Sequence, residues 1–294
     1  MIKVACAPCS WGVESSEQGD NPSWGKVLME TREAGYDGIE LGPLGYFPDD
    51  PAILKSSLRV RGVTACAGNL HDVFSKPEAR DSILANAQKE IDRLVAIGVD
   101  KLLIMDKANA IRDAYIGHGA IAPRLSFSQQ QAMIETMTEV ARLASSHGIR
   151  TLLHPSSGGY VAFPDEIEAV MNAISPQLLG LCLDVGHMYI DGMKPDEMLR
   201  QYANRLEHLH MKDIDGQQLH IALRDRCGIT RAYSQGLTRP LGQGNINFSN
   251  IFNVLQEIDY QGWLVVEHER PVYDQLNVKA DLAKSRMFLA ECGV

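Results

Sequence analysis

Three side chains that can bind a cation stand at the ends of short apolar runs. Asp184 ends the run LGLCLD, His210 lies near the end of LEHLHMKD, and Glu267 follows the run WLVV. One imidazole and two carboxylates form a mixed nitrogen and oxygen ligand set, which favours a transition metal over Mg²⁺ or Ca²⁺. The sequence therefore predicts one divalent metal site, with Mn²⁺, Co²⁺ or Zn²⁺ expected before Mg²⁺, if the fold brings these residues together.

Other polar residues stand at the ends of the remaining apolar runs. His187 follows Asp184 by three residues and is a candidate to orient a ligand or the substrate, with an ordinary loop histidine as the alternative. His208 and His210 lie two residues apart on one run, so they share a face in different layers, and His210 is the one expected at the rim. The other run-end residues are Ser10, Trp11, Glu40, Asn69, His71, Asp106, Lys107, His154, Lys212, Asp213, His268 and Glu269.

A repeated pattern predicts where these run ends lie in a fold. An amphipathic stretch ends at Gly, and a short apolar run follows within a few residues. Glycine suits the left-handed position just past a helix, and β-branched residues then favour a strand. With three further apolar runs, the strand candidates are residues 2–10, 33–41, 60–68, 96–105, 146–154, 179–187, 206–213 and 260–268.

Helical patterns alternate with these strand candidates. They cover residues 22–34, 77–97, 128–147, 164–174, 194–203, 247–258 and 275–291, with a weaker pattern at 50–60. The strand candidates are mostly continuous apolar runs, which is typical of parallel strands covered on both faces. Eight strand–helix units in series predict an α/β fold, the (β/α)8 TIM barrel. An open doubly wound sheet is the alternative, but no GxGxxG motif follows the first strand candidate.

The barrel prediction gives the polar run ends a common position. Barrels carry their chemistry at the C-terminal ends of the strands, so these side chains are expected at one rim. The pattern contains no linker, which predicts a single domain over residues 1–294. Two long connections, 106–127 and 213–246, are expected to lie over the same C-terminal face as lids or walls.

Composition limits the classes of partner. The 294 residues are 45% hydrophobic and 22% charged, the balance of a soluble globular protein. A formal net charge of −9 repels phosphate backbones, so no nucleic-acid partner is expected. No apolar run approaches about 18 residues, so no membrane partner is expected. Cys6 and Cys9 have CxxC spacing without a second such pair, and no signal peptide is evident, so we predict a cytoplasmic protein with free thiols.

Several segments resemble the xylose-isomerase-like TIM barrel superfamily, and the resemblance covers essentially the whole chain. It rests on LCLDVGH, EHLHMKD, LVVEHE and PLGQGNINFSNIF. The superfamily includes sugar-phosphate isomerases, ketose 3-epimerases, endonuclease IV, and the inositol-catabolism enzymes inosose isomerase and inosose dehydratase. The segments APCSWGV and HPSSGGYVAFPDEIEAVM are most similar to the inosose dehydratase branch. The DxGH and HxKD motifs are moderately specific for the superfamily and weak for the substrate.

The resemblance implies a divalent metal held by Asp184, His210, Glu267 and a residue after the fifth strand. Epimerases carry Glu at that last position, where this sequence has His154. Dehydratase-like members often have His there and Glu shortly afterwards, at what is here Ala162. His154 is therefore the candidate fourth ligand, and a water molecule is the alternative.

The same departure bears on the reaction that the resemblance implies. Epimerisation beside a ketone works best with two bases, which in this family are the carboxylates after the fifth and eighth strands. Dehydration needs one base for the α-proton and one acid for the departing hydroxide. His154 therefore favours a metal-dependent lyase that dehydrates a small polyhydroxylated ketone, such as an inosose, through an enolate. A sugar isomerase or ketose epimerase, a metal-free sugar-binding barrel, and an endonuclease disfavoured by the negative charge are the alternatives.

Roles within this scheme are hypotheses. Glu267 is a metal ligand and candidate base, and His154 is a ligand or acid. Lys212 is assigned to catalysis, where it binds hydroxyls or stabilises charge. The candidate substrate-binding residues are Trp11, Glu40, His71 and His187, with core packing as the alternative for Trp11. The expected partner is a small polyol or sugar ketone, and a homo-oligomer is left open.

Overall fold

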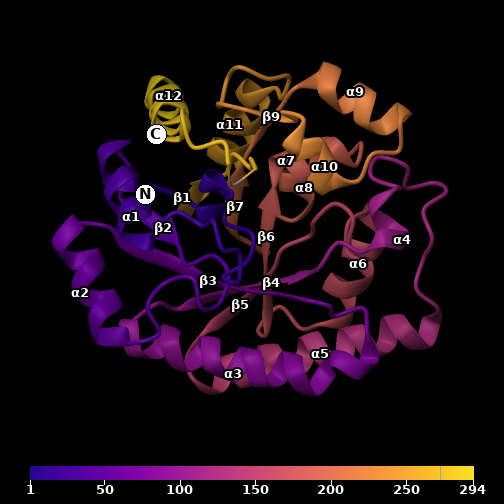
Figure 1. Cartoon of the computed structure of the whole chain (residues 1–294). Coiled ribbons are helices and arrows are strands. Elements are labelled where there is room, and N and C mark those ends of the chain that lie inside the picture. The colour runs from indigo at the N-terminus through magenta and orange to yellow at the C-terminus, as the bar shows by residue number, and fades with distance from the viewer. Residues whose placement is uncertain (272) are drawn as a thin grey trace.

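The eight apolar runs form parallel strands that close into a barrel (Figure 1). The structure is a computed structural model that describes residues 1–271 and 273–294. Around the barrel the order is β1-β10-β7-β6-β5-β4-β3-β2, and β1 closes the ring by pairing Val4 with Leu264 of β10. The barrel strands are β1 (Ile2–Cys6), β2 (Gly38–Glu40), β3 (Thr64–Asp72), β4 (Lys101–Asp106), β5 (Arg150–Leu153), β6 (Leu179–Asp184), β7 (Leu206–Met211) and β10 (Gly262–Val266).

Helices alternate with these strands and surround the barrel, which confirms the predicted (β/α)8 fold (Figure 1). The main helices are α1 (Trp24–Glu33), α2 (Pro51–Arg61), α3 (Arg80–Ile97), α5 (Phe127–Ser146), α6 (Pro164–Ala173), α8 (Pro195–Gln201), α11 (Phe248–Glu257) and α12 (Val278–Glu291). Shorter ones are η1 (Pro8–Trp11), η2 (Pro77–Ala79), α4 (Ala110–Asp113), α7 (Val185–Ile190), α9 (Gly216–Arg224) and α10 (Ile229–Ser234).

Local sequence signals explain where several helices begin and end. The Ser126 hydroxyl accepts a hydrogen bond from the Gln129 backbone in a capping box that starts α5. Asp50 caps α2 through the backbone N–H groups of Ala52 and Ile53. Gly98 follows α3 with φ of 80°, the left-handed conformation that the glycine pattern predicts. Each helix thus ends a few residues before the strand that carries a run-end residue to the rim.

Apolar side chains pack on both sides of the strands, as expected for strands covered on both faces. Helix side chains such as Leu28, Ile91 and Val140 pack around the outside of the barrel and are buried. A smaller apolar cluster comprises Ala67 of β3, Leu103 of β4, Leu152 of β5 and Cys182 of β6. Within the described residues, no helix is both long and apolar enough to cross a bilayer.

The two long connections contain structure that the sequence patterns did not predict. Residues 106–127 include α4, and 213–246 include α9, α10 and the antiparallel pair β8 (Asp213–Ile214) with β9 (Thr238–Arg239). The first follows the C-terminal end of β4, and the second begins two residues after β7. Arg112 holds the first connection in place, because its buried guanidinium donates to the Gly159 carbonyl and pairs with Glu166 of α6.

A candidate metal centre at the barrel rim

The three residues of the predicted metal site converge at the C-terminal ends of neighbouring strands. Asp184 ends β6 opposite His210 of β7, and Glu267 follows β10, the next strand around the barrel. Nδ1 of His210 lies 3.3 Å from Oε2 of Glu267 and 3.8 Å from Oδ2 of Asp184. A cation bonded to each atom at about 2.0–2.2 Å would separate its ligands by similar distances. The three side chains therefore form one candidate cation site.

The two carboxylate oxygens of Asp184 have different surroundings, one at the start of a helix and the other at the candidate cation site. Its Oδ1 caps α7 by accepting hydrogen bonds from the backbone N–H groups of Gly186, at 2.7 Å, and His187, at 3.0 Å. That capping fixes the carboxylate and leaves Oδ2 directed at the imidazoles of His154 and His210, each 3.8 Å away. The DxGH motif thus both starts a helix and orients a ligand oxygen.

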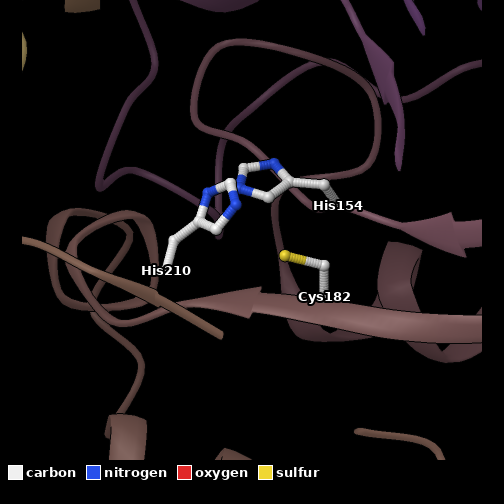
Figure 2. Close-up of side chains that lie close together, drawn as sticks. All are labelled: His154, Cys182 and His210. Atoms are coloured by element: carbon white, nitrogen blue, oxygen red, sulfur yellow. The ribbon is translucent and has the colours of Figure 1, made fainter. Parts of the chain in front are cut away.

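His154 follows β5 and lies beside this group, with its Nε2 3.8 Å from Oδ2 of Asp184. Its ring is only 2% exposed, and the ring centroid lies 4.6 Å from that of His210 (Figure 2). Among the described residues, neither ring nitrogen of His154 has a hydrogen-bond partner, and Nδ1 of His210 has none either. Buried polar atoms are almost always paired, and each unpaired one costs about 1–3 kcal/mol. Nitrogens that face Asp184 without a partner fit a divalent cation bound between them.

Glu40 lies behind His210 rather than in the open site. It ends β2, is fully buried, and its Oε1 accepts hydrogen bonds from Nε2 of His208 at 2.9 Å and of His210 at 2.8 Å. Burial alone would raise the pKa of Glu40, but the two imidazoles outweigh it and hold that pKa well below its ordinary value. Since a carboxylate only accepts, Nε2 of His210 carries hydrogen, and Nδ1 is the nitrogen directed at the site.

Lys212 brings a positive charge to the same place. Its fully buried Nζ lies 3.0 Å from Oδ2 of Asp184 and 3.3 Å from Oε2 of Glu267, and it contacts the Glu269 carboxylate. Burial opposes the charge, but Asp184 and Glu269 outweigh it and keep the pKa of Lys212 well above its ordinary value. The ammonium also lies 3.4 Å from Nε2 of His187.

Glu269 was given no role by the sequence analysis. It is buried, and its pKa rises to about 8 because of burial and the charges of Glu267 and Asp184, with Lys212 opposing. Burial also raises the pKa of Glu267, but the charges of His210 and Lys212 outweigh burial and lower that pKa to about 2. The surroundings therefore shift the pKa values of two carboxyl groups two residues apart in opposite directions. Their spacing, which places both on one face of an extended chain, was the available signal.

His187 is held at the edge of the site by groups that the sequence did not reveal. Its Nδ1 accepts a hydrogen bond from the Ser157 backbone at 3.2 Å and lies 3.1 Å from the Ser157 hydroxyl. That hydroxyl donates to Oδ2 of Asp191 at 2.8 Å. Burial raises the pKa of Asp191 to about 7. These contacts fix the imidazole with Nε2 directed at Lys212.

The remaining predicted substrate-binding residues differ in their exposure to solvent. Trp11 is fully buried and its indole N–H donates to Glu30 at 2.6 Å, which fits core packing rather than a wall against substrate. Glu40 likewise has no exposed surface for a substrate hydroxyl, so we correct its predicted role to orienting His210. His71 lies on β3 with an exposed side chain.

A cavity of about 560 Å³ lies beside the centre and suits a small molecule. Of the residues around the cation site, it is lined by Glu269 and by none of Asp184, His210 or Glu267. Its other walls include Tyr233 of α10 and Thr238 of β9, so the connection 213–246 supplies part of its lining. Glu269 and Tyr233, whose ring centroid is 5.5 Å from Lys212 Nζ, thus connect the cavity with the Lys212 ammonium.

Comparison with known proteins agrees with this fold. The family model described as xylose isomerase-like TIM barrel matches residues 28–292. An inosose dehydratase of Geobacillus kaustophilus is 27% identical over 272 residues, covering 92% of this chain and 88% of that protein. A D-allulose 3-epimerase from Methylomonas sp. superposes with a TM-score of 0.72 at 18% identity, over 99% of this chain and 98% of that one. The IolI protein with a bound zinc atom gives a TM-score of 0.73 at 17% identity, over 99% and 97%.

Proposed function

The chain belongs to the xylose isomerase-like TIM barrel family, and from this premise we propose that it is a divalent-metal-dependent dehydratase. Its substrate is a small polyhydroxylated ketone of the inosose type, and elimination proceeds through an enolate. The similarity to inosose dehydratases over 92% of the chain supports the substrate class. The observation that carries the proposal is the buried His154 beside Asp184 and His210, because neither of its nitrogens has a hydrogen-bond partner in the part of the chain that the structure describes.

The ligand set is His154, Asp184, His210 and Glu267. Two imidazoles and two carboxylates favour Mn²⁺, Co²⁺ or Zn²⁺ over Mg²⁺, because imidazole nitrogen is a borderline ligand that transition metals prefer. The zinc atom in the similarly folded IolI protein is consistent with such an ion. When bound, the cation would polarise the ketone carbonyl and stabilise the negative charge that develops on enolisation.

Glu267 is the candidate base for the α-proton. Its low pKa keeps the carboxylate ionised, and 11% of its side chain remains exposed, whereas Asp184 has none. His154 occupies the place where epimerases of the family carry a second carboxylate. A base on one face alone suits elimination, which needs one base and one acid, better than epimerisation, which needs a base on each face.

Lys212 and Glu269 supply the acid. The Lys212 ammonium contacts Glu269, and Glu269 lines the cavity, so a proton is available at the cavity edge to assist the departure of hydroxide. We assign His187, 3.4 Å from Lys212 Nζ, and the exposed His71 to binding substrate hydroxyls. The carboxylate base at Glu267 and the ammonium acid at Lys212 lie 3.3 Å apart, so both act on the same side of the substrate.

Product analysis tests this proposal against the isomerase or epimerase alternative. The protein, loaded in turn with Mn²⁺, Co²⁺ and Zn²⁺, is incubated with inososes and with common ketoses in D₂O. We expect an inosose to lose water, and the product is followed by its ultraviolet absorbance and identified by proton NMR. We expect Glu267→Gln to abolish the reaction. A ketose that gains deuterium and inverts its α-carbon without losing water would instead establish an epimerase.

A further inference from the structure

A chain of hydrogen bonds runs from the edge of the candidate cation site to a buried carboxyl group at the end of α7. Nδ1 of His187 lies 3.1 Å from the Ser157 hydroxyl, and that hydroxyl lies 2.8 Å from Oδ2 of Asp191. Asp191 directly follows α7, and its Oδ1 accepts a hydrogen bond from the Gly117 backbone at 2.8 Å. The chain therefore joins His187 to a carboxyl group that has no task in the proposed reaction.

The backbone determines which nitrogen of His187 accepts a hydrogen bond. The Ser157 N–H group donates to Nδ1 at 3.2 Å, and a backbone N–H can only donate. Nδ1 therefore carries no hydrogen in this geometry, and the neutral ring carries its hydrogen on Nε2. Nε2 lies 3.4 Å from Nζ of Lys212, which is also a donor, and 3.9 Å from Oδ2 of Asp184, which is too far for a hydrogen bond. The Nε2–H group is thus available to donate to a ligand oxygen in the site.

The Ser157 hydroxyl has one hydrogen and two neighbours that could accept it. When Asp191 is ionised, the hydroxyl donates to Oδ2, and the hydroxyl oxygen then faces the lone pair of Nδ1 at 3.1 Å. When Asp191 is neutral, its carboxyl hydrogen goes to the hydroxyl oxygen, and the hydroxyl hydrogen goes to Nδ1. The neutral arrangement avoids the repulsion between lone pairs and keeps the ring hydrogen on Nε2. The protonation of Asp191 therefore acts on His187 through a single hydroxyl group.

The surroundings of Asp191 bring both of its forms within reach near neutral pH. Burial raises the pKa of Asp191 to about 7, although the hydrogen bonds that it accepts lower that pKa. Of the charged side chains that act on it, Arg112 opposes the rise and Glu166 adds to it, and these two pair with each other at 2.9 Å. His118 of the same connection as Arg112 bonds to the Leu223 carbonyl through Nε2. Burial is therefore the main cause of the raised pKa.

We propose that Asp191 and Ser157 are positioning residues that set the tautomer of His187. Neutral Asp191 donates through Ser157 to Nδ1, so Nε2 keeps its hydrogen and donates to a substrate oxygen. Ionised Asp191 takes the Ser157 hydrogen bond, the ring hydrogen moves to Nδ1, and Nε2 becomes an acceptor for the Lys212 ammonium. Asp191 releases one proton to solvent in this change, and the imidazole carries one hydrogen throughout. The substrate contact rests on the proposed function, because it concerns the same site.

Nitrogen NMR of the full chain tests the tautomer directly. Protein labelled with ¹⁵N in histidine is measured with and without Zn²⁺ at about pH 6 and about pH 8.5, on either side of the Asp191 pKa. The nitrogen shift separates an N–H from a bare ring nitrogen, and the His187 signals are those absent from His187→Gln. Asp191→Asn is the analogue of neutral Asp191, and Ser157→Ala interrupts the chain. Asp113→Asn is the matched control, because burial also raises the pKa of Asp113 and its carboxylate accepts from the Ile229 backbone, outside this chain.

We expect wild type and Asp113→Asn to carry the His187 hydrogen on Nε2 at the lower pH and to shift it toward Nδ1 at the higher pH. Asp191→Asn should keep the hydrogen on Nε2 at both, because its NH₂ group donates to Ser157 at any pH. Ser157→Ala should lose the response to pH. In dehydration assays, kcat/KM of wild type should fall roughly three- to tenfold between the two pH values, the effect of one neutral hydrogen bond. That fall should disappear in Asp191→Asn.

The outcomes separate this inference from the proposed function, and thermal unfolding shows that each variant is folded. A His187 tautomer that is the same at both pH values in wild type would overturn the inference. An Asp191→Asn variant that follows wild type would overturn it as well, because the response would then come from another group. The expected tautomer change without any dehydration would overturn the proposed function and leave the control of His187 by Asp191 intact.

Discussion

Replacing Glu40 with glutamine tests whether the charge of this buried carboxylate, which accepts a hydrogen bond from His210, strengthens cation binding by that histidine. Glu40 holds His208 and His210 through Oε1 and accepts from Nδ2 of Asn69 through Oε2 at 3.1 Å. Glutamine has the same shape and can keep its oxygen toward the histidines. Its new NH₂ group then faces Asn69, whose Oδ1 has no hydrogen-bond partner among residues 1–271 and 273–294 and can turn to accept from it. The substitution therefore removes the charge while the geometry is largely retained.

The expected magnitude follows from the loss of that charge. A hydrogen bond to a charged group contributes about 1.5–3 kcal/mol net, against about 1 kcal/mol for a neutral pair. Of the two bonds from histidine, only the one to His210 acts on a cation ligand. Losing its charged part lowers the basicity of Nδ1 and costs about 1.4 kcal/mol of cation binding, a tenfold increase in Kd. Outer-shell partners of metal ligands contribute about 10–100-fold in other proteins, so this value is at the lower end.

The assay is a competition titration of Zn²⁺ against a chromophoric chelator, with thermal unfolding as the check on folding. Glu90→Gln is the matched control, since Glu90 is also fully buried but pairs with Arg93 on α3 rather than with a histidine. We expect Glu40→Gln to raise the Kd for Zn²⁺ about tenfold and Glu90→Gln to leave it unchanged. A change under about threefold in folded Glu40→Gln, or an equal change in both variants, would refute the reasoning.

Three further predictions address other parts of the site. His154→Leu should abolish tight Zn²⁺ binding. In the metal-free protein it should raise the free energy of unfolding by roughly 1–3 kcal/mol, because it removes unpaired buried nitrogens. A lower free energy of unfolding in urea for the metal-free variant would contradict this. Lys212→Met should lower kcat by about 10²–10⁴-fold in a folded protein, and a kcat within about tenfold of wild type would exclude the acid role. Asp191 has a folded pKa of about 7, above its ordinary 3.8, so its stabilising effect is complete below about pH 4 and is lost as the pH rises through 7. Asp191→Asn should therefore gain stability relative to wild type between pH 4 and 8, by at most roughly 4 kcal/mol, and a difference that does not vary with pH would contradict this.

The candidate ligands were predictable because each stands at a fixed place in a local pattern. Asp184, His210 and Glu267 lie within one residue of the ends of strands β6, β7 and β10, and barrel closure aligns such ends at one rim. Glycines such as Gly98 marked where helices stop, so the order of elements was also predictable. Periodicity and spacing were sufficient for these features, since both act over a few residues.

Contacts across the barrel could not be predicted in the same way. Glu40 and His208 are 168 residues apart, and the sequence identified Glu40 only as a polar residue at a strand end. Whether such a residue faces substrate or supports a ligand depends on strand register, which closure of the ring determines. Trp11 is a similar case, because its burial depends on η1 folding back so that its indole can reach Glu30. The helices α9 and α10 of the connection 213–246 are too short to show a clear helical period of apolar residues, so the sequence pattern did not reveal them.

The most direct test of the account is the dependence of dehydration on bound cation. The protein is freed of metal with a chelator, and Zn²⁺ or Co²⁺ is added back in measured equivalents. The initial rate of inosose dehydration is followed by ultraviolet absorbance at each addition. A single centre built from His154, Asp184, His210 and Glu267 predicts no rate without cation and a linear rise that levels off at one equivalent. A full rate in the metal-free protein would contradict the central claim.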